Sequence, residues 1–161
     1  VMMPAPVFYV FYFANMLGDE LIASGDGYFI TRKGDSYQII TYHYIHYGDL
    51  FAAGELFDIT ETNRYTAFDT TKSFDISLQL TEVANGNYNV KEYFVNRHHG
   101  NAYDIWLEMG AIPLSPKDTD LFRGLCVPGF HQSRLYAEKH ALTYTAELEP
   151  FEIRFAEISP L

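Results

Sequence analysis

The sequence predicts a mainly β protein: an antiparallel β-sandwich over residues 21–158, with helix confined to an N-terminal segment and to residues 101–124. Residues 74–80 and 142–148 alternate apolar with polar side chains, which is typical of strands with one buried face. Tight-turn residues separate these segments from other short apolar runs. Short strands joined by turns are typical of an antiparallel sandwich.

The first predicted element is an N-terminal helix. Pro4 and Pro6 are typical of a helix start because proline is tolerated in the first turn, and Gly18 predicts a glycine C-cap. Residues 7–17 are apolar or aromatic on almost every side, and a short strand is the alternative for so short a run. A helix of this kind has to be buried all round, yet the remaining chain covers about one face. We therefore expect a missing partner on the other face.

Strands and turns follow from residue 28 onward. Gly34 to Ser36 is expected to turn the first pair of strands into a hairpin. Asn85-Gly86 is expected to pair the next two strands in the same way. The predicted strands are residues 27–33, 37–47, 74–80, 88–97, 142–148 and 151–155.

A helical insertion is predicted between the two groups of strands. Residues 103–111 have the pattern of one short helix. Ser115 followed by Pro116 predicts the start of a second helix, with the serine as N-cap and the proline at the first helical position.

Composition excludes several classes of protein. The 161 residues are enough for one domain with a real core, and 48% apolar against 20% charged residues excludes a disordered chain. A net charge of −10 would repel nucleic acid and anionic membrane surfaces. No continuous apolar run approaches the roughly 20 residues of a bilayer span. We therefore expect neither nucleic acid nor a membrane as partner.

The single cysteine and the N-terminal residues give indications of the cellular compartment. Cys126 is the only cysteine, so it forms no internal disulfide and favours a reducing, cytoplasmic compartment, with secretion left open. No basic residue precedes the first apolar run, unlike the start of a signal peptide. Because the chain opens on Val1, we interpret it as a piece of a longer protein.

Histidines are the first candidates for a metal site, and they occur as two pairs. His43 and His46 fall in one predicted strand, and His98 and His99 fall at the end of another. On a strand the members of each pair point to opposite faces, so neither pair converges on one zinc ion. We predict no metal site and no cofactor.

Catalytic groups are not marked by any spacing. None of the 21 acids is singled out as half of the carboxylate pair that a glycosidase needs. Glu92 is expected to be partly buried, and a salt bridge to a nearby arginine explains it equally well. Cys126 lies in an apolar setting that favours an inert thiol. Trp106 and exposed tyrosines have faces suited to sugar rings, although core and interface positions are the simpler interpretation. We name no catalytic residue.

Six strings, together with Asn96-Arg97, carry a family resemblance. They are FYVFYFANMLGDEL at residues 8–21, YQIITYHY at 37–44, TNRYT at 62–66, GNYNVKEY at 86–93, YDIWLEMGA at 103–111 and LEPFEIR at 148–154. In this order, over nearly the whole chain, they resemble the C-terminal part of bacterial β-xylosidases of glycoside hydrolase family 39 (GH39). His98-His99 departs from the family pattern, in which a more charged or aromatic pair is expected.

The resemblance implies a parent enzyme with an N-terminal (β/α)8 barrel and a C-terminal β-sandwich. Such an enzyme hydrolyses β-1,4-xylosides of xylo-oligosaccharides with retention, through two glutamates at the ends of barrel strands. Those glutamates match no residue here, so no catalytic residue is carried over. Residues 1–20 then resemble the last barrel helix, and residues 21–161 the accessory sandwich.

The implied role of the chain is therefore accessory. It would cover a flank of its own catalytic barrel and support contacts in a homo-oligomer, and it would be inactive alone. The insertion at residues 96–111 is expected to approach the active-site side of the parent. The alternative is a carbohydrate-binding module that itself holds xylan through exposed aromatic side chains.

Overall fold

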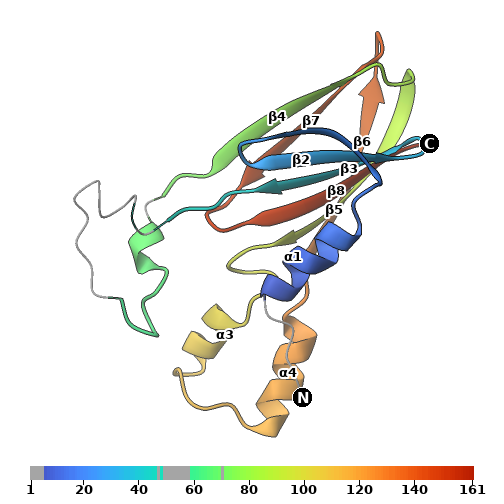
Figure 1. Ribbon diagram of the computed structural model, residues 1–161. Coiled ribbons are helices and arrows are strands. Elements are labelled where there is room, and N and C mark those ends of the chain that lie inside the picture. Colours follow the sequence, from blue (N-terminus) through green and yellow to red (C-terminus); the bar gives the residue numbers. More distant parts are fainter. Residues whose placement is uncertain (1–5, 47, 49–58, 70) are drawn as a thin grey trace.

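The fold is mainly β, with eight strands in two antiparallel sheets among the described residues (Figure 1). The computed structural model describes residues 6–46, 48, 59–69 and 71–161. Pro4, at the predicted helix start, and Tyr47, at the predicted end of a strand, lie outside the described residues. The predicted antiparallel, mainly β class is confirmed.

One sheet has six strands and the other has two. The larger sheet contains, in spatial order, β1 (Glu20–Gly25), β2 (Tyr28–Lys33), β3 (Ser36–Tyr42), β8 (Ile153–Pro160), β5 (Gly86–Val95) and β6 (Gly129–Ala137). The smaller sheet contains β4 (Phe74–Thr81) and β7 (Ala141–Leu148). The predicted hairpin across residues 34–36 is confirmed: β2 pairs with β3, with Lys33 opposite Ser36.

The main core lies between the two sheets. Alternate residues of β4 and β7 are buried, as their alternating sequence predicts. They pack against inward-facing residues of the larger sheet. The most deeply buried members of this core are Ile39, Val90, Leu142, Leu148, Ala156 and Ile158.

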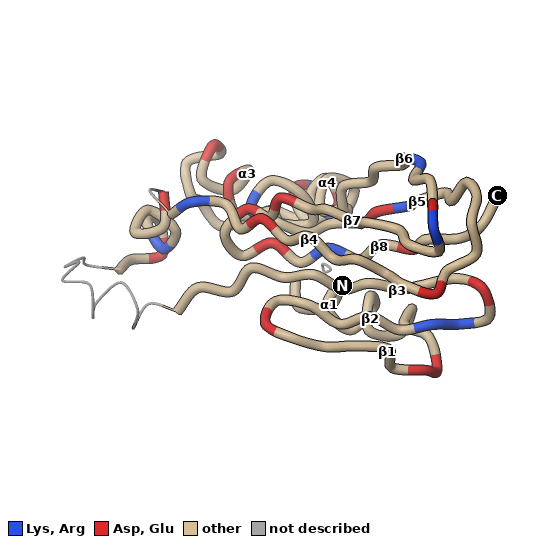
Figure 2. The backbone as a smooth tube through the Cα atoms, turned by 90° about the horizontal axis from the view of Figure 1, so that it is seen from above, with Lys and Arg blue, Asp and Glu red and all other residues tan. Residues whose placement is uncertain are grey.

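Helix α1 (Pro6–Asn15) covers the other face of the larger sheet (Figure 1). Ile39 belongs to the core between the sheets, and its neighbour Ile40 packs against the helix, because successive strand residues point to opposite faces. From the helix, Tyr9 and Phe13 are buried, and the ring of Phe13 stacks on that of Phe155 at 6.0 Å. Figure 2 shows charged residues mainly in turns and at the end that carries α3 (Tyr103–Glu108), whereas α1 has none.

Gly18 is not the C-cap that the sequence predicts. It does not adopt the left-handed conformation of a glycine cap, and α1 ends at Asn15. A Cβ atom at Gly18 would instead lie 2.4 Å from the carbonyl oxygen of Arg32. Its N–H donates to the Thr31 hydroxyl at 2.8 Å. The residue is small because the chain after α1 passes directly against β2.

The expected pairing across Asn85-Gly86 is wrong. β4 pairs with β7, and β5 pairs with β6 and β8, so the turn connects the two sheets instead of closing a hairpin. The crossing begins at Glu82, whose φ is 62°, and buries Val83 between the sheets. Asn85 fixes the far end by accepting a hydrogen bond from the N–H of His140 at 2.7 Å.

Two strands were not predicted, and two others end early. β1 and β6 are edge strands that are mostly exposed, so neither has the alternation that marks a half-buried strand. β3 ends at Tyr42 and β5 at Val95, which leaves residues 43–46 and 96–97 in loops.

The helical insertion is confirmed by α3 and by α4 (Pro116–Leu125). Ser115 caps α4 in a capping box: its hydroxyl accepts from the N–H of Asp118, whose carboxylate accepts from the N–H of Ser115. These two hydrogen bonds lower the pKa of Asp118. A short 3-10 helix, η1 (Thr66–Phe68), was not predicted. None of the helices in the described part of the chain has the length and apolar character that a membrane span requires.

Candidate functional site

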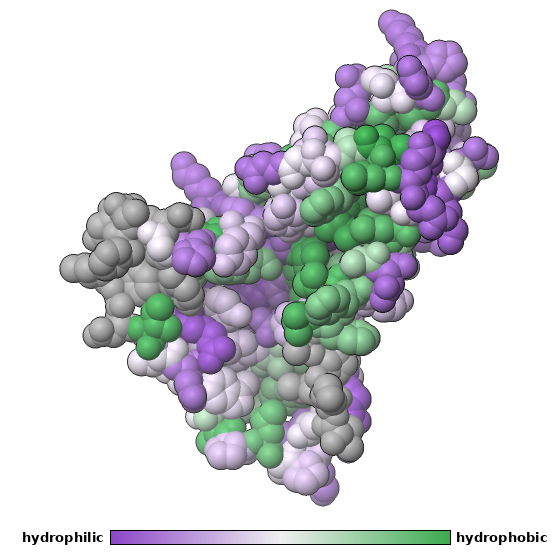
Figure 3. Space-filling model, in the orientation of Figure 1, coloured by the Kyte–Doolittle hydropathy of each residue, from purple (hydrophilic) through white to green (hydrophobic). Residues whose placement is uncertain are grey.

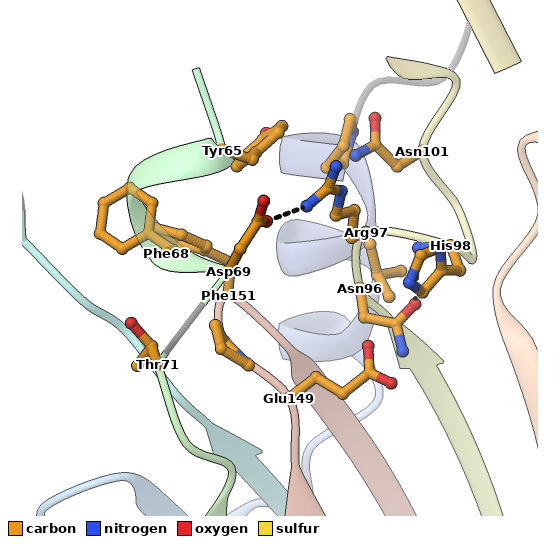
Figure 4. A pocket seen from close by; sticks show the side chains of 13 residues that line it. Tyr65, Phe68, Asp69, Thr71, Asn96, Arg97, His98, Asn101, Glu149 and Phe151 are labelled. Carbon is orange, nitrogen blue, oxygen red and sulfur yellow. Dashed lines mark hydrogen bonds and ion pairs between the residues drawn. The ribbon is translucent and has the colours of Figure 1, made fainter. Parts of the chain in front are cut away.

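Three loop segments form a pocket at one end of the sandwich (Figure 4). Residues 65–69 around η1, with Thr71, form one wall. Residues 95–101 after β5 form the opposite wall, and the turn at residues 149–151 contributes the third side. Pro6, at the start of α1, also lines it. The cavity has a volume of about 300 Å³. This volume lies at the lower end of the range for small-molecule sites.

The loop after β5 is held by Asn96, which is buried at its base. The side-chain oxygen Oδ1 of Asn96 accepts hydrogen bonds from the backbone N–H groups of His98 at 3.0 Å and His99 at 2.9 Å. The side-chain nitrogen Nδ2 of Asn96 donates to the carboxylate of Glu152 at 3.1 Å. Gly100, with φ of 70°, closes the loop so tightly against Val95 that a Cβ would lie 2.9 Å from a methyl group. Arg97 is therefore held at a fixed place on the pocket wall.

Arg97 joins the two walls of the pocket. Its Nη1 donates to Asp69 at 2.8 Å across the cavity (Figure 4), and its Nε donates to Asp104 at 2.9 Å. The guanidinium carbon also lies 5.7 Å from the centre of the Tyr65 ring. Burial disfavours the charged guanidinium, but the hydrogen bonds to Asp104 and Asp69 outweigh it, so the pKa of Arg97 is raised.

Aromatic rings form the apolar side of the pocket. Phe151 meets Phe68 edge to face at 4.6 Å and Tyr65 at 5.7 Å. Phe151 has φ of 63°, a conformation that bulky residues rarely adopt. Its turn is closed by the N–H of Glu152 donating to the carbonyl of Glu149 at 3.1 Å. The ring is thus presented to the pocket from a position that favours glycine.

A buried polar network lies behind the pocket. The guanidinium of Arg154 contacts Glu152 at 2.6 Å and Glu92 at 3.3 Å, and the hydroxyl of Tyr144 donates to Glu92 at 2.8 Å. Burial disfavours the charge of Arg154, but Glu152 and then Glu92 outweigh it and raise its pKa. Burial, followed by the Glu92 carboxylate, raises the pKa of Tyr144.

The expected burial of Glu92 and its salt bridge to an arginine are confirmed. The side chains of Glu92 and Glu152 are 7% and 1% exposed, and both carboxylates face the guanidinium of Arg154. Neither residue lines the pocket. This pair has the geometry of a structural ion-pair cluster, because a catalytic pair has to reach a substrate.

The four candidate histidines, His43, His46, His98 and His99, lie in loops, so the prediction that they lie in strands is wrong. His98 is exposed, with Nδ1 3.4 Å from Asp104, and the ring of His99 contacts the side chain of Asn96. His43 packs on the ring of Phe74 at 5.5 Å. Among the residues that the structure describes, no three His, Cys, Asp or Glu side chains form a group able to hold a metal ion.

Cys126 and Trp106 both make structural contacts. Cys126 is buried, and burial raises the pKa of its thiol, which disfavours the reactive thiolate. Its carbonyl accepts a hydrogen bond from Tyr9 of α1 at 2.6 Å. The indole N–H of Trp106 donates to the carbonyl of Ile112 at 2.9 Å, which closes the chain after α3.

The predicted insertion at residues 96–111 supplies one wall of the pocket, with Asn96, Arg97, His98 and Asn101. Its expected position near the active site of the parent stays a prediction. Asp69 and Phe151 were not considered, although each follows a string that carries the family resemblance or lies within one. Pro150 preceding Phe151 was the available sign of a tight turn.

Comparison with known proteins identifies the fold. No protein-family model matches the chain. The solved GH39 enzyme from Xanthomonas axonopodis pv. citri matches with a TM-score of 0.71 and 12% identity, over 97% of this chain and 30% of that one. A monomeric β-xylosidase from Caulobacter crescentus CB15 matches at 0.67 and 20% identity, over 97% and 31%. A GH39 β-xylosidase from Caulobacter crescentus matches at 0.59 and 17%, over 96% and 28%.

The matches cover nearly all of this chain but only a part of each enzyme. Almost the whole chain is superimposed in each case, but it spans only about 30% of the length of these enzymes. The fold expected from the sequence resemblance is therefore the fold observed, and the chain has the fold of a part of GH39 glycoside hydrolases.

Proposed function

We propose that this chain is the C-terminal accessory β-sandwich domain of a GH39 β-xylosidase and that it supports the catalytic barrel without catalysing the reaction itself. The observation that carries the proposal is the match of 97% of the chain to about 30% of a GH39 enzyme. The strings that resemble the same family, which run in order along the chain, support it independently.

The outer face of α1 supports a role in covering another domain. Its inner face packs on the larger sheet, whereas Val7, Phe8, Val10, Phe11 and Tyr12 are between 40% and 67% exposed. Figure 3 shows hydrophobic residues in a band along the side that carries α1, β1 and β2. Fully burying one such side chain stabilises by roughly 1.5–3 kcal/mol, so an apolar partner surface is strongly favoured. We assign this face to the barrel, with residues 1–20 as the last segment of the barrel and α1 as its last helix.

The reading frame upstream of the Val1 codon tests the domain assignment directly. It should encode a (β/α)8 barrel that carries two glutamates at the carboxyl ends of its strands. An upstream sequence that encodes an unrelated domain would contradict the proposal, whatever the behaviour of the isolated chain.

The 161-residue chain should not hydrolyse an aryl β-xyloside above a buffer blank. Glu92 and Glu152 are buried against Arg154, the pocket carboxylate of Asp69 is ion-paired with Arg97, and Glu149 is exposed to solvent. A glycosidase instead holds two carboxyl groups at a set separation on either side of the scissile bond. Release of the aryl alcohol, followed by absorbance, is the measurement.

The pocket residues supply the decisive variants for this assay. Turnover that survives purification and is abolished by Asp69→Asn or Glu149→Gln would place a catalytic carboxylate in this domain. Turnover that both variants retain and that disappears on further purification would be assigned to a contaminating enzyme.

The alternative is a module that holds xylan through exposed aromatic side chains. Phe130 and Tyr136 are exposed and have the same parity along β6, so they share a face of the strand. Six residues of strand separate them by roughly 20 Å, and the ring of Phe130 packs against that of Tyr93 at 5.1 Å, so the two rings do not form one continuous platform. No observation therefore favours this alternative over the accessory role.

A further inference from the structure

We propose that the pocket between residues 65–69, 95–101 and 149–151 binds one neutral sugar ring, a cyclic polyol with an apolar face. This goes beyond the proposed function, because supporting a barrel requires no ligand in this domain. The proposal depends on the pocket residues alone and stands whether or not the parent is a β-xylosidase.

The charges of the pocket favour a neutral ligand. Asp69 and Glu149 contribute two carboxylates and Arg97 one guanidinium, with Asp104 behind the arginine. An anion would meet an excess of negative charge. An organic cation would find Arg97 already placed beside the face of Tyr65. Hydroxyl groups suit the site, because each one both donates and accepts.

Both hydrogen-bond donors and acceptors line the cavity. The carboxylates of Asp69 and Glu149 accept hydrogen bonds, and the Asn101 side chain can do both. Arg97 uses Nε–H on Asp104 and one Nη1–H on Asp69. Among the described contacts, its three other N–H groups remain for ligand or water. Neighbouring hydroxyls of a sugar ring match this arrangement.

The apolar wall is built around Phe151, which is held in a left-handed conformation that glycine adopts more readily. The ring of Phe151, together with Tyr65 and Phe68, offers aromatic surface to the C–H face of a sugar. In Figure 4 these rings lie on one side of the cavity, and Asn96, Arg97 and Asn101 lie on the other.

The size of the cavity sets the length of the ligand. A volume of about 300 Å³ suits one ring and excludes a chain of several. Affinity should therefore not rise when further sugar units are added, in contrast to a binding module that uses scattered exposed aromatics.

Titration of the 161-residue chain with D-xylose, D-glucose and xylotriose, followed by amide chemical shifts, tests the proposal. At least one monosaccharide should shift amides in the three loop segments, and xylotriose should bind no more tightly than that monosaccharide. Inorganic phosphate and choline serve as the charged probes and should not bind there. Shifts elsewhere with affinity that rises with chain length, binding of a charged probe in place of sugar, or no binding at all would each overturn it.

Three variants locate the binding. Glu149→Gln should lower the affinity about tenfold, because it removes a charged hydrogen-bond acceptor. Phe151→Gly should lower it at least as much while keeping the turn, since glycine adopts positive φ without cost. Glu138→Gln, in the β6–β7 turn at the other end of the sandwich, is the matched control and should bind like the wild type (Figure 1). Equal affinity of all three variants would contradict the assignment to this pocket.

Discussion

Replacing Arg154 by methionine should lower the free energy of unfolding by about 3–5 kcal/mol. Arg154 is the shared partner of two buried carboxylates, Glu92 and Glu152. Without it, two negative charges would face each other away from water, and a buried charge that loses its partner is strongly destabilising. The guanidinium also lies 5.0 Å from the centre of the Phe94 ring, so this contact would be lost too. Urea denaturation followed by tyrosine and tryptophan fluorescence measures the change.

Arg32→Met is the matched control for this prediction. Arg32 pairs with Glu20 at 2.8 Å on the surface, with both side chains about half exposed, and such solvent-screened pairs contribute little to stability. Where the Arg154→Met chain is too unstable to purify, Arg154→Lys keeps the charge, loses the two-pronged contact with Glu152 and should show a smaller loss. A loss at Arg154 no larger than that at Arg32 would show that the network is not a stabilising unit.

Local pattern predicted strands well where one face is buried and the other meets water. Residues 74–80 and 142–148 alternate because β4 and β7 form an outer sheet with one wet face. The same pattern contains no information on pairing. β4 was expected to pair across Asn85-Gly86, yet its partner β7 comes some sixty residues later. Pairing is decided by which apolar faces fit together in the core, and this depends on the whole chain.

Edge strands escaped prediction for the opposite reason. β6 carries polar side chains on both faces, since it is paired on one side only and is mostly exposed. Its place in the sheet depends on backbone hydrogen bonds to β5, which leave no trace in side-chain hydropathy. The N-terminus of α4, in contrast, was predictable because Ser115 and Asp118 cap the helix through local contacts.

The candidate site was only partly predictable because it is built from segments far apart in the sequence. Asp69 and Arg97 are 28 residues apart and meet across the pocket. The aromatic turn at Phe151 comes from a third segment. Each residue alone is an ordinary loop residue, and only the fold brings the ion pair and the rings together. A charge or an aromatic in a loop becomes informative once its neighbours in space are known.

The outer face of α1 was predictable from the sequence alone, and it leads to the second large effect. We expect the 161-residue chain to self-associate through α1, because Phe8 and Phe11 are 53% and 67% exposed on a helix without charges. The double variant Phe8→Ser with Phe11→Ser should weaken this association at least about a hundredfold. Sedimentation equilibrium of wild type and variant over a range of concentrations measures the dissociation constant of the dimer.

The test has a matched control because the chain exposes other large apolar side chains to a similar extent. Tyr136 and Leu161 are 65% and 69% exposed, and both lie beside Asn87, at the opposite end of β5 from Val95, which packs with α1. The double variant Tyr136→Ser with Leu161→Ser should therefore associate like the wild type. Equal weakening by both double variants would indicate non-specific association of apolar surface. A wild-type chain that stays monomeric while α1 remains ordered and exposed would mean that this face needs no partner. In that case the prediction of self-association through α1 would be wrong, because burying two phenylalanines drives association only when the gain exceeds the entropy that the two copies lose.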